Sequence, residues 1–330
     1  MKDLFIAGKR IGPGETREIN LTISEFHTAT PANIPITVFR GVKDGPVLFV
    51  SAAIHGDELN GVGVIRKIID EWDITAFNGS LVCLPIVNRF GFLHHSRYLP
   101  DRRDLNRCFP GDPSGPIASR ISHILFHEVI LKCTHGIDLH TASLRRSNIP
   151  HVRADMSNKE IRRMAKSFGT EIIIDHSGTQ GSLRHSASIS GVMTILFEAG
   201  ETNRFQKKMI KKGFTGVYNV MAELGMIKRK KVAPEYQVVV KKTEWVRADK
   251  GGILDILKKP GEIVYKEEEV AVITNPYGKE VHTQRSPLTG LIVGITTVPL
   301  ANPGSGICHV AKLNKTLPLV EKAMLSRRTQ

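Results

Sequence analysis

Apolar runs and amphipathic runs alternate along the first part of the chain. The short apolar runs, typical of strands buried on both faces, are Val47–Ala53, Ser80–Val87, Gly136–His140, Glu171–Asp175 and Val192–Glu198. Apolar residues recur at helical spacing in Leu59–Glu71, Pro116–Lys132, Asn158–Phe168 and Gln206–Leu224. This alternation indicates an α/β fold with a mixed, mostly parallel sheet flanked by helices. Active sites in such sheets form at the carboxyl ends of the strands.

The pattern changes after Gly225, where a basic segment, Met226–Pro234, resembles a connector. Short β-rich runs follow it, at Gln237–Val240, Glu244–Ala248, Glu262–Tyr265, Glu269–Thr274 and Thr289–Thr296. Turns that contain glycine and proline separate these runs. The sequence therefore predicts two domains, a catalytic domain at residues 1–225 and a smaller C-terminal all-β domain at residues 226–330.

Composition narrows the class of protein. The 330 residues are 41% hydrophobic and 24% charged, which is ordinary for a folded chain. No run approaches the roughly twenty apolar residues that span a membrane, and the first ten residues lack the apolar core of a signal peptide. We therefore expect a cytoplasmic protein without a membrane partner. Its four scattered cysteines are expected to be free thiols.

The net charge of +14 admits two interpretations, a nucleic-acid surface or an electrostatic field that attracts anionic substrates. Much of the charge lies in short runs such as Lys228–Lys231, which are typical of solvated faces. No helix-turn-helix, RNA-binding strand or zinc-finger signature accompanies it. We therefore expect a small anionic substrate and no nucleic-acid partner. Steep salt-dependent retention on DNA would indicate the opposite.

Two separated segments contain the residue types that a catalytic zinc needs. His55 and Glu58 lie three residues apart where a predicted strand turns into a helix, and His140 ends another predicted strand. Two histidines and one glutamate form a known catalytic zinc set that leaves the fourth position to water. Asp138 or a backbone carbonyl is a candidate to orient one imidazole. A lone H-x-x-E pair arises easily by chance, so the hypothesis depends on the combination.

Glu198 is the candidate general base. It ends the strongly apolar run that begins at Val192, and a carboxylate in that position can take a proton from water and return it to a leaving amine. The structural alternative is a cap for the following loop. Glu201 is a second candidate, less favoured because it lies further into that loop.

Several arginines lie in the loop-like segment Arg97–Gly111. A guanidinium group can bind a carboxylate through two hydrogen bonds, or stabilise an oxyanion that develops at an amide carbonyl. The alternative is that these arginines are surface charges, or that they pair with Asp101 and Asp104. We favour the surface interpretation for Arg102 and Arg103.

Four motifs occur in an order and at a spacing that resemble the succinylglutamate desuccinylase/aspartoacylase family, which is related to the zinc carboxypeptidases. They are H-G-D-E at His55–Glu58, D-L-N-R-x-F-P-G at Asp104–Gly111, D-L-H-T at Asp138–Thr141, and F-E at Phe197–Glu198. The resemblance covers roughly Asn33 to Gly225. It implies a zinc-carboxypeptidase-like fold, and it implies that the part after Gly225 is a small β barrel or sandwich bordering the active-site mouth.

The resemblance also implies roles for individual residues. One zinc ion per chain is bound by three ligands, His55, Glu58 and His140. Glu198 is the general base, Arg97 polarises the scissile carbonyl, and the substrate carboxylate is bound by Asn106 and Arg107. The loop between Arg97 and Asn106 is expected to be longer than in aspartoacylases.

Known substrates of the family are N-acetylaspartate, succinylglutamate and acetylated diaminobutyrate. The residues that separate these substrates are expected in two loops, Arg145–His151 and His176–Ser190. Arg184 and His185 in the second loop are candidates to contact an acyl or carboxylate group, although exposed loop polarity explains them equally well.

The sequence thus predicts a zinc-dependent deacylase, of the deacetylase or desuccinylase type, that acts on an N-acyl amino acid or a similar carboxylate-bearing amide. One alternative is a metallocarboxypeptidase that acts on short peptides. Another is a metal-binding family member without catalysis, which the presence of Glu198 disfavours. The oligomeric state, a homo-oligomer included, stays open.

Overall fold

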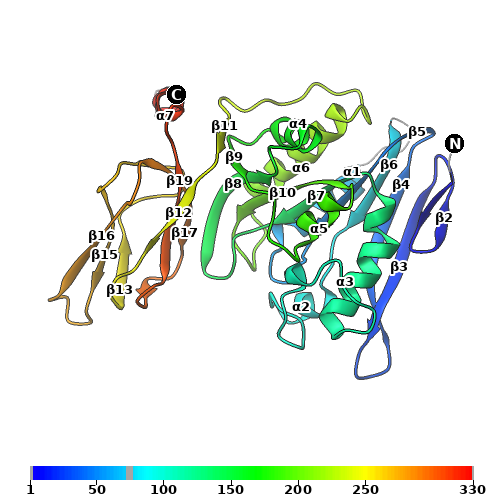
Figure 1. Ribbon diagram of the computed structural model, residues 1–330, viewed down its shortest axis with the longest axis horizontal. Helices are drawn as coiled ribbons and strands as arrows, with labels where there is room; N and C mark the ends of the chain where they lie inside the picture. The colour runs from blue at the N-terminus through cyan, green and yellow to red at the C-terminus, as the bar shows by residue number, and fades with distance from the viewer. Residues whose placement is uncertain (1–2, 72–76, 329–330) are drawn as a thin grey trace.

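The computed structural model describes residues 3–71 and 77–328 (Figure 1). Met1 and Lys2, part of the segment considered for a signal peptide, lie outside these ranges. The helices are α1 Asn60–Glu71, α2 Arg89–Leu93, α3 Ile117–Glu128, α4 Lys159–Phe168, α5 Leu183–Ile189, α6 Lys207–Glu223 and α7 Leu317–Arg328. The strands up to the predicted domain boundary are β1 Leu4–Ile6, β2 Lys9–Ile11, β3 Thr16–Glu25, β4 Pro31–Arg40, β5 Lys43–Ala52, β6 Asn78–Leu84, β7 His135–His140, β8 Arg146–Ala154, β9 Ile172–Asp175 and β10 Met193–Gly200. The later strands are β11 Val238–Val240, β12 Thr243–Arg247, β13 Gly252–Ile256, β14 Ile263–Val264, β15 Glu269–Thr274, β16 Val281–Arg285, β17 Gly290–Thr296, β18 Leu300–Ala301 and β19 Gly306–Lys312.

A large mixed sheet organises the molecule. Its main path runs β12-β19-β17-β8-β10-β7-β5-β6-β4-β3, and β9, β11 and β14 pair beside this path. The central strands β6, β5, β7 and β10 are parallel, whereas β8 runs antiparallel to β10. The predicted α/β class, with a mixed sheet flanked by helices, is confirmed.

Helices cover both faces of the central strands. The core on one face takes its side chains from α1, α4 and α6, and the core on the other face takes them from α2, α3 and α5. Successive residues of β5 serve both cores: Leu48 and Val50 pack into the first, and Phe49 packs into the second. A strand with two buried faces needs a continuous apolar run, which is why the sequence is apolar here instead of alternating.

Local sequence signals fix the ends of α4. The Asn158 side chain accepts hydrogen bonds from the backbone N–H groups of Glu160 and Ile161, so it caps the first turn. Gly169 follows the helix with a φ of 91°, a left-handed conformation that suits glycine. The predicted helix Asn158–Phe168 therefore differs from the observed one only by its capping residue.

Other predictions differ from the structure. The helix expected at Pro116–Lys132 ends at Glu128, and a separate 3-10 turn follows at Ile130–Lys132. The loop expected at Arg145–His151 is wrong beyond its first residue, because β8 begins at Arg146 and its backbone pairs with β10 and β17. The loop expected at His176–Ser190 contains helix α5.

The part of the chain after Gly225 adds antiparallel sheets at the C-terminal end, together with helix α7, which the sequence pattern did not predict. A four-stranded sheet there has the order β16-β15-β13-β18. Strands of this part also extend the large sheet, since β17 pairs with β8 and β11 pairs with β9. The boundary between residues 225 and 226 stays a prediction.

The structure bears on two of the expectations drawn from composition, one about the cysteines and one about membrane-spanning helices. All four cysteines are free thiols, and three of them are buried. Within residues 3–71 and 77–328, no helix has both the length and the apolar character needed to cross a membrane.

Phe168 gives a test of the core beside the sheet. It is 1% exposed, and its ring lies 4.8 Å from the ring of Phe197 on β10. We expect Phe168→Ala to lower the free energy of unfolding by about 3–5 kcal/mol, because it leaves a cavity. The matched change Phe205→Ala, at a 52% exposed position, should cost about 1 kcal/mol or less. Urea unfolding monitored by circular dichroism measures both, and equal losses would contradict this description of the core.

Candidate metal and substrate site

The three predicted metal ligands meet at one edge of the large sheet. His55 and Glu58 lie in the turn between β5 and α1, and His140 is the last residue of β7. Because β5 and β7 are parallel neighbours, their carboxyl ends lie side by side. All three side chains are buried, and one ligand atom from each lies within 4.8 Å of the others.

Gly56 allows the turn that carries two of these residues. A Cβ atom built on Gly56 would lie 1.9 Å from the backbone carbonyl carbon of Gly91 in α2. Only glycine permits backbones to approach this closely. The glycine of the H-G-D-E motif therefore allows the turn that carries His55 and Glu58 to pack directly against the backbone of α2.

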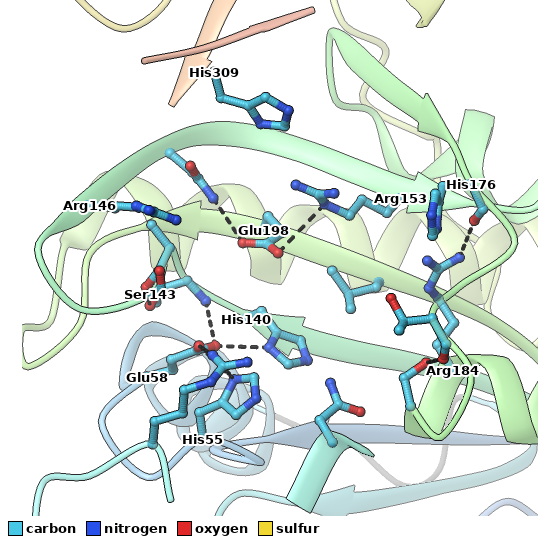
Figure 2. A pocket seen from close by; sticks show the side chains of 18 of the residues that line it. His55, Glu58, His140, Ser143, Arg146, Arg153, His176, Arg184, Glu198 and His309 are labelled. Carbon is cyan, nitrogen blue, oxygen red and sulfur yellow. Dashed lines mark hydrogen bonds and ion pairs between the residues drawn. The ribbon is translucent and has the colours of Figure 1, made fainter. Parts of the chain in front are cut away.

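Glu58 joins the two histidines. Its Oε1 lies 2.7 Å from Nδ1 of His55, and its Oε2 lies 2.9 Å from Nδ1 of His140 (Figure 2). The backbone N–H of Thr141 also donates a hydrogen bond to Oε2 at 3.0 Å. The Nδ1 atoms of both imidazoles and the carboxylate thus converge on one small volume.

An aspartate holds the outer nitrogen of each imidazole. Nε2 of His55 lies 3.2 Å from Asp104 Oδ1, and Nε2 of His140 lies 2.8 Å from Asp138 Oδ2. Ser51 fixes Asp138 in turn through a hydrogen bond of 2.7 Å. A carboxylate bound to the outer nitrogen fixes the tautomer and leaves Nδ1 free for a metal. The candidate Asp138 is therefore correctly placed, and Asp104 has the corresponding position at His55.

The buried charges of this cluster support one another. Burial by itself would lower the pKa of His140, but the charges of Asp138 and Glu58 raise it well above its usual range. Burial would likewise raise the pKa of Glu58, but the charges of His55 and His140 lower it well below its usual range. The buried carboxylates therefore stabilise positive charge here, which is what a divalent cation requires.

Glu198 lies on β10, directly opposite His140 in the register of β10 and β7. Two residues of β8 hold its carboxylate (Figure 2). Asn148 donates a hydrogen bond to Oε2 at 2.9 Å, and Arg153 Nε lies 3.6 Å from Oε1. The competing candidate Glu201 instead forms an ion pair with Arg204 at the surface. Its Oε2 atom lies 3.5 Å from Nη1 of Arg204.

Arg97 lies against the metal-ligand cluster. Its Nη1 atom is 3.1 Å from Nδ1 of His55 and 3.5 Å from Oε1 of Glu58. Its Nη2 atom donates to Asp104 Oδ2 at 2.8 Å. The pairing with Asp104 that was considered as an alternative is thus present, and it keeps the guanidinium group beside the cluster.

Asn106 and Arg107 form a short 3-10 turn, Leu105–Arg107, that begins at Asp104. The Asn106 Oδ1 atom accepts a hydrogen bond from the backbone N–H of Leu183 at 2.8 Å, which ties this turn to α5. The Arg107 Nη1 atom donates to the carbonyl oxygen of Asn106 at 2.6 Å. Within the described parts of the chain, the amide N–H₂ of Asn106 and the other N–H groups of Arg107 make no hydrogen bond, so they are available to a ligand.

One pocket of about 250 Å³ contains all seven predicted site residues. Its lining also includes Ser143, Arg146, Asn148, Arg153, His176, Arg184, Trp245 and His309. Arg184, one of the two candidates from the second predicted loop, is 4% exposed, and burial together with the charge of Arg153 lowers its pKa to about 10. Burial contradicts the exposed-loop explanation for Arg184.

Sequence reasoning expected substrate-separating residues in Arg145–His151 without naming one, and it missed Arg153 of β8 and the residues that β12 and β19 contribute. Arg146 and Asn148 lie on β8 within the segment expected to be a loop, Arg153 lies on β8 beyond that segment, and Trp245 and His309 come from the C-terminal part. No motif marks these positions. The one available signal was the concentration of polar residues in a segment beside the D-L-H-T motif.

Comparison with known proteins identifies the family of this chain. Residues 44–224, more than half of the chain, match the family model "Succinylglutamate desuccinylase/Aspartoacylase catalytic domain". The chain belongs to this family of deacylases, as its motifs predicted. The N-alpha-acetyl-L-2,4-diaminobutyric acid deacetylase of Halomonas elongata is 23% identical to it over 266 residues, which cover 77% of this chain and 78% of the relative.

Solved structures share the fold over nearly the whole chain. The product-bound ectoine utilization protein EutE (DoeB) from Ruegeria pomeroyi superposes with a TM-score of 0.83 at 19% identity, covering 90% of this chain and 95% of that one. A succinylglutamate desuccinylase/aspartoacylase from Rhodobacter sphaeroides superposes with a TM-score of 0.82 at 20% identity, covering 91% and 95%.

The aspartate bound to His140 gives a test of the candidate metal site. We expect Asp138→Asn to lower the affinity for zinc about 10–100-fold, because the amide no longer fixes the imidazole as the carboxylate does. Competition with a chromophoric chelator measures this affinity. The control Asp155→Asn alters an aspartate that binds Ser157 instead. Equal affinities of both variants would argue against a metal at this cluster.

Proposed function

We propose that this chain is a zinc-dependent amidohydrolase that cleaves the amide bond of an N-acyl amino acid or a similar carboxylate-bearing small molecule. The observation that carries the proposal is the juxtaposition, in one pocket, of a two-histidine, one-glutamate cluster with the carboxylate of Glu198. Two of the similar proteins, a deacetylase and a succinylglutamate desuccinylase/aspartoacylase, support the same class of reaction.

The residues of the cluster fit a zinc ion. Two imidazole nitrogens and a carboxylate are a common catalytic zinc set. His55 and His140 each have Nε2 held by an aspartate, so Nδ1 is the nitrogen that remains for the metal. Zinc bound by these residues and Glu58 would polarise a carbonyl oxygen and lower the pKa of water to about 7.

Glu198 is the proton carrier of the proposed reaction. Its carboxylate accepts a proton from the attacking water and then donates it to the nitrogen of the leaving amine. Asn148 and Arg153 hold the two carboxylate oxygens from the neighbouring strand, which restricts the orientation of the group. A fixed orientation helps because proton transfer requires hydrogen-bond distance and alignment.

Three further residues bind and polarise the substrate. Arg97 donates to the carbonyl oxygen as negative charge develops on it, and its guanidinium group is held for this role by Asp104. Asn106 and Arg107 bind the carboxylate of the amino acid through the N–H groups that the protein leaves available.

The size of the pocket favours a small substrate over a peptide. Its volume is about 250 Å³, and Trp245 and His309 from the C-terminal part form one of its walls. These observations disfavour the metallocarboxypeptidase alternative. The cytoplasmic location expected from the sequence is consistent with a small metabolite as the substrate.

Metal analysis combined with a substrate panel tests the proposal. The purified protein should contain stoichiometric zinc, and it should release amine from one class among N-acetyl, N-succinyl and dipeptide substrates. Chelation should abolish that release. Stoichiometric zinc without turnover of any member of the panel would overturn the proposed reaction, and absence of metal binding would overturn the whole mechanism.

Glu198→Gln separates the base from the metal ligands. We expect this variant to bind zinc as the parent protein does and to lose turnover by about 10²–10⁴-fold, which is the usual contribution of general acid–base catalysis. Zinc content is measured by elemental analysis and turnover by amine release. Loss of zinc in this variant would mean that base and ligand are misassigned.

Arg107→Ala tests the anchor for the substrate carboxylate. We expect KM to rise while kcat changes little, because this contact is made equally in the ground state and the transition state. The control is an amide substrate whose carboxylate is replaced by a neutral carboxamide, for which parent and variant should differ little. An unchanged KM for the carboxylate substrate would contradict the assignment.

A further inference from the structure

The proposed general base has a hydrogen-bond partner that lies directly beside the C-terminal part of the chain. Asn148 on β8 donates from Nδ2 to Oε2 of Glu198 at 2.9 Å (Figure 2). In the ladders on either side of β8, Asn148 is paired with Gly200 of β10 and with Gly294 of β17. Since β17 belongs to the C-terminal part, the residue that orients the base is in contact with that part.

An extra residue in β8 turns Asn148 toward the base. From Glu198 to Gly200 the ladder advances two residues on β10 and three residues on β8. A regular ladder would place Ile149 opposite Gly200, and Asn148 would then point to the other face of the sheet. Pro150 lies within this irregularity, which suits a residue that has no N–H to donate to a ladder. The bulge therefore puts the Asn148 amide on the same face as Glu198.

Gly294 leaves the space that the Asn148 side chain occupies. A Cβ atom built on Gly294 would lie 2.3 Å from Oδ1 of Asn148 and 3.5 Å from its Cγ, so any side chain at this position would displace the amide. The backbone of Gly294 is not in the left-handed region, so the contact and not the conformation requires a glycine here. Because Oδ1 faces the glycine, Nδ2 faces Glu198 and can donate to its carboxylate.

A second bulge brings Gly294 to this contact. Strand β17 contains one extra residue, Val293, between Ile292 and Gly294 relative to its other neighbour, β19. The pairing of β17 with β8 begins at Gly294, directly after this bulge. Bulges bend a strand and redirect its side chains, and they are frequent beside active sites. Two bulges thus meet at the point where the C-terminal part contacts the partner of the base.

We propose that Gly294 and Asn148 are positioning residues through which the C-terminal part fixes the orientation of Glu198, and this proposal rests on the proposed function. The amide of Asn148 restricts the carboxylate to the position from which it takes a proton from water, and Gly294 keeps that amide in place. Such contacts matter because a misplacement of about 1 Å can lower a rate about a hundredfold. The C-terminal part then takes part in catalysis in addition to forming a wall of the pocket.

The first test is the steady-state kinetics of two variants, with the N-acyl amino acid that the parent hydrolyses fastest. Asn148→Ala should lower kcat about 10–100-fold, the usual effect of losing a hydrogen bond to a charged group. Gly294→Ala should lower kcat to a similar extent, because the added methyl group displaces the same amide. KM and zinc content should stay within about twofold of the parent values, because the lost contact binds neither substrate nor metal.

The double variant Asn148→Ala/Gly294→Ala separates positioning from damage to the fold. If the methyl group acts through the Asn148 amide, adding it to Asn148→Ala should change kcat by less than about twofold, since effects that share one contact are not additive. If Gly294 served only the packing of β17, the methyl group would lower kcat by the same factor in both backgrounds. That outcome would overturn the proposal.

Gly251→Ala is the matched control. It also adds a methyl group to a glycine of the C-terminal part, but a Cβ atom there would meet nothing closer than 3.4 Å. Gly251 does not line the pocket. We expect this variant to keep the kcat and KM of the parent. A loss of kcat equal to that of Gly294→Ala would mean that the contact with Asn148 is not the cause, which contradicts the proposal.

Crystal structures give a readout that does not depend on turnover. In Gly294→Ala, Nδ2 of Asn148 should lie beyond hydrogen-bond distance, more than about 3.5 Å, from Oε2 of Glu198. In Gly251→Ala the contact of 2.9 Å should remain. An unchanged contact in Gly294→Ala would overturn the positioning role and leave the amidohydrolase intact. Failure of the parent to hydrolyse any amide would overturn the proposed function instead, and the two structures would still decide whether Gly294 holds Asn148 against Glu198.

Discussion

The carboxylate of Glu58 is bound on both of its oxygens, and the rest of the site depends on this contact. It links a histidine from the turn after β5 to a histidine at the end of β7, and the backbone of Thr141 binds the same group. A carboxylate that is 2% exposed is stable only when nearby positive or hydrogen-bonding groups compensate the loss of water. The fold provides that compensation by placing the ends of parallel strands side by side, so the geometry of the sheet and the chemistry of the cluster cannot be separated.

The charge around this cluster is distributed unevenly along the pocket. Near the ligands, negative charge is in excess, and Arg97 is held there by Asp104. Farther away the lining is rich in arginines, of which Arg107, Arg146 and Arg184 have no carboxylate within ion-pair distance in the described parts of the chain. One region therefore favours a metal cation and the other favours an organic anion. A field of this kind orients a substrate before any specific contact forms, since charged groups act over about a Debye length of 8–10 Å.

The parts of the structure that could be predicted from sequence are those encoded locally. The apolar run of β5, the cap at Asn158 and the glycine at the end of α4 each act within a few residues. The motifs at His55 and His140 could be placed because both lie at the carboxyl ends of neighbouring parallel strands, β5 and β7. Strand β8 could not be predicted, because polar side chains interrupt its apolar pattern. Its partners, β10 and β17, also come from distant segments of the chain. The same holds for His309, whose place in the pocket depends on pairing between strands far apart in the chain.

The pairing of β17 with β8 has a consequence for how substrates enter and leave. Backbone hydrogen bonds join the C-terminal part directly to the strand that carries Arg146 and Asn148. In many two-part enzymes a cleft opens when one part rotates about a flexible connection. Here such a rotation would have to break a β-ladder, exposing N–H and C=O groups that need partners. Access to the pocket therefore falls to side chains and short connecting segments at its rim.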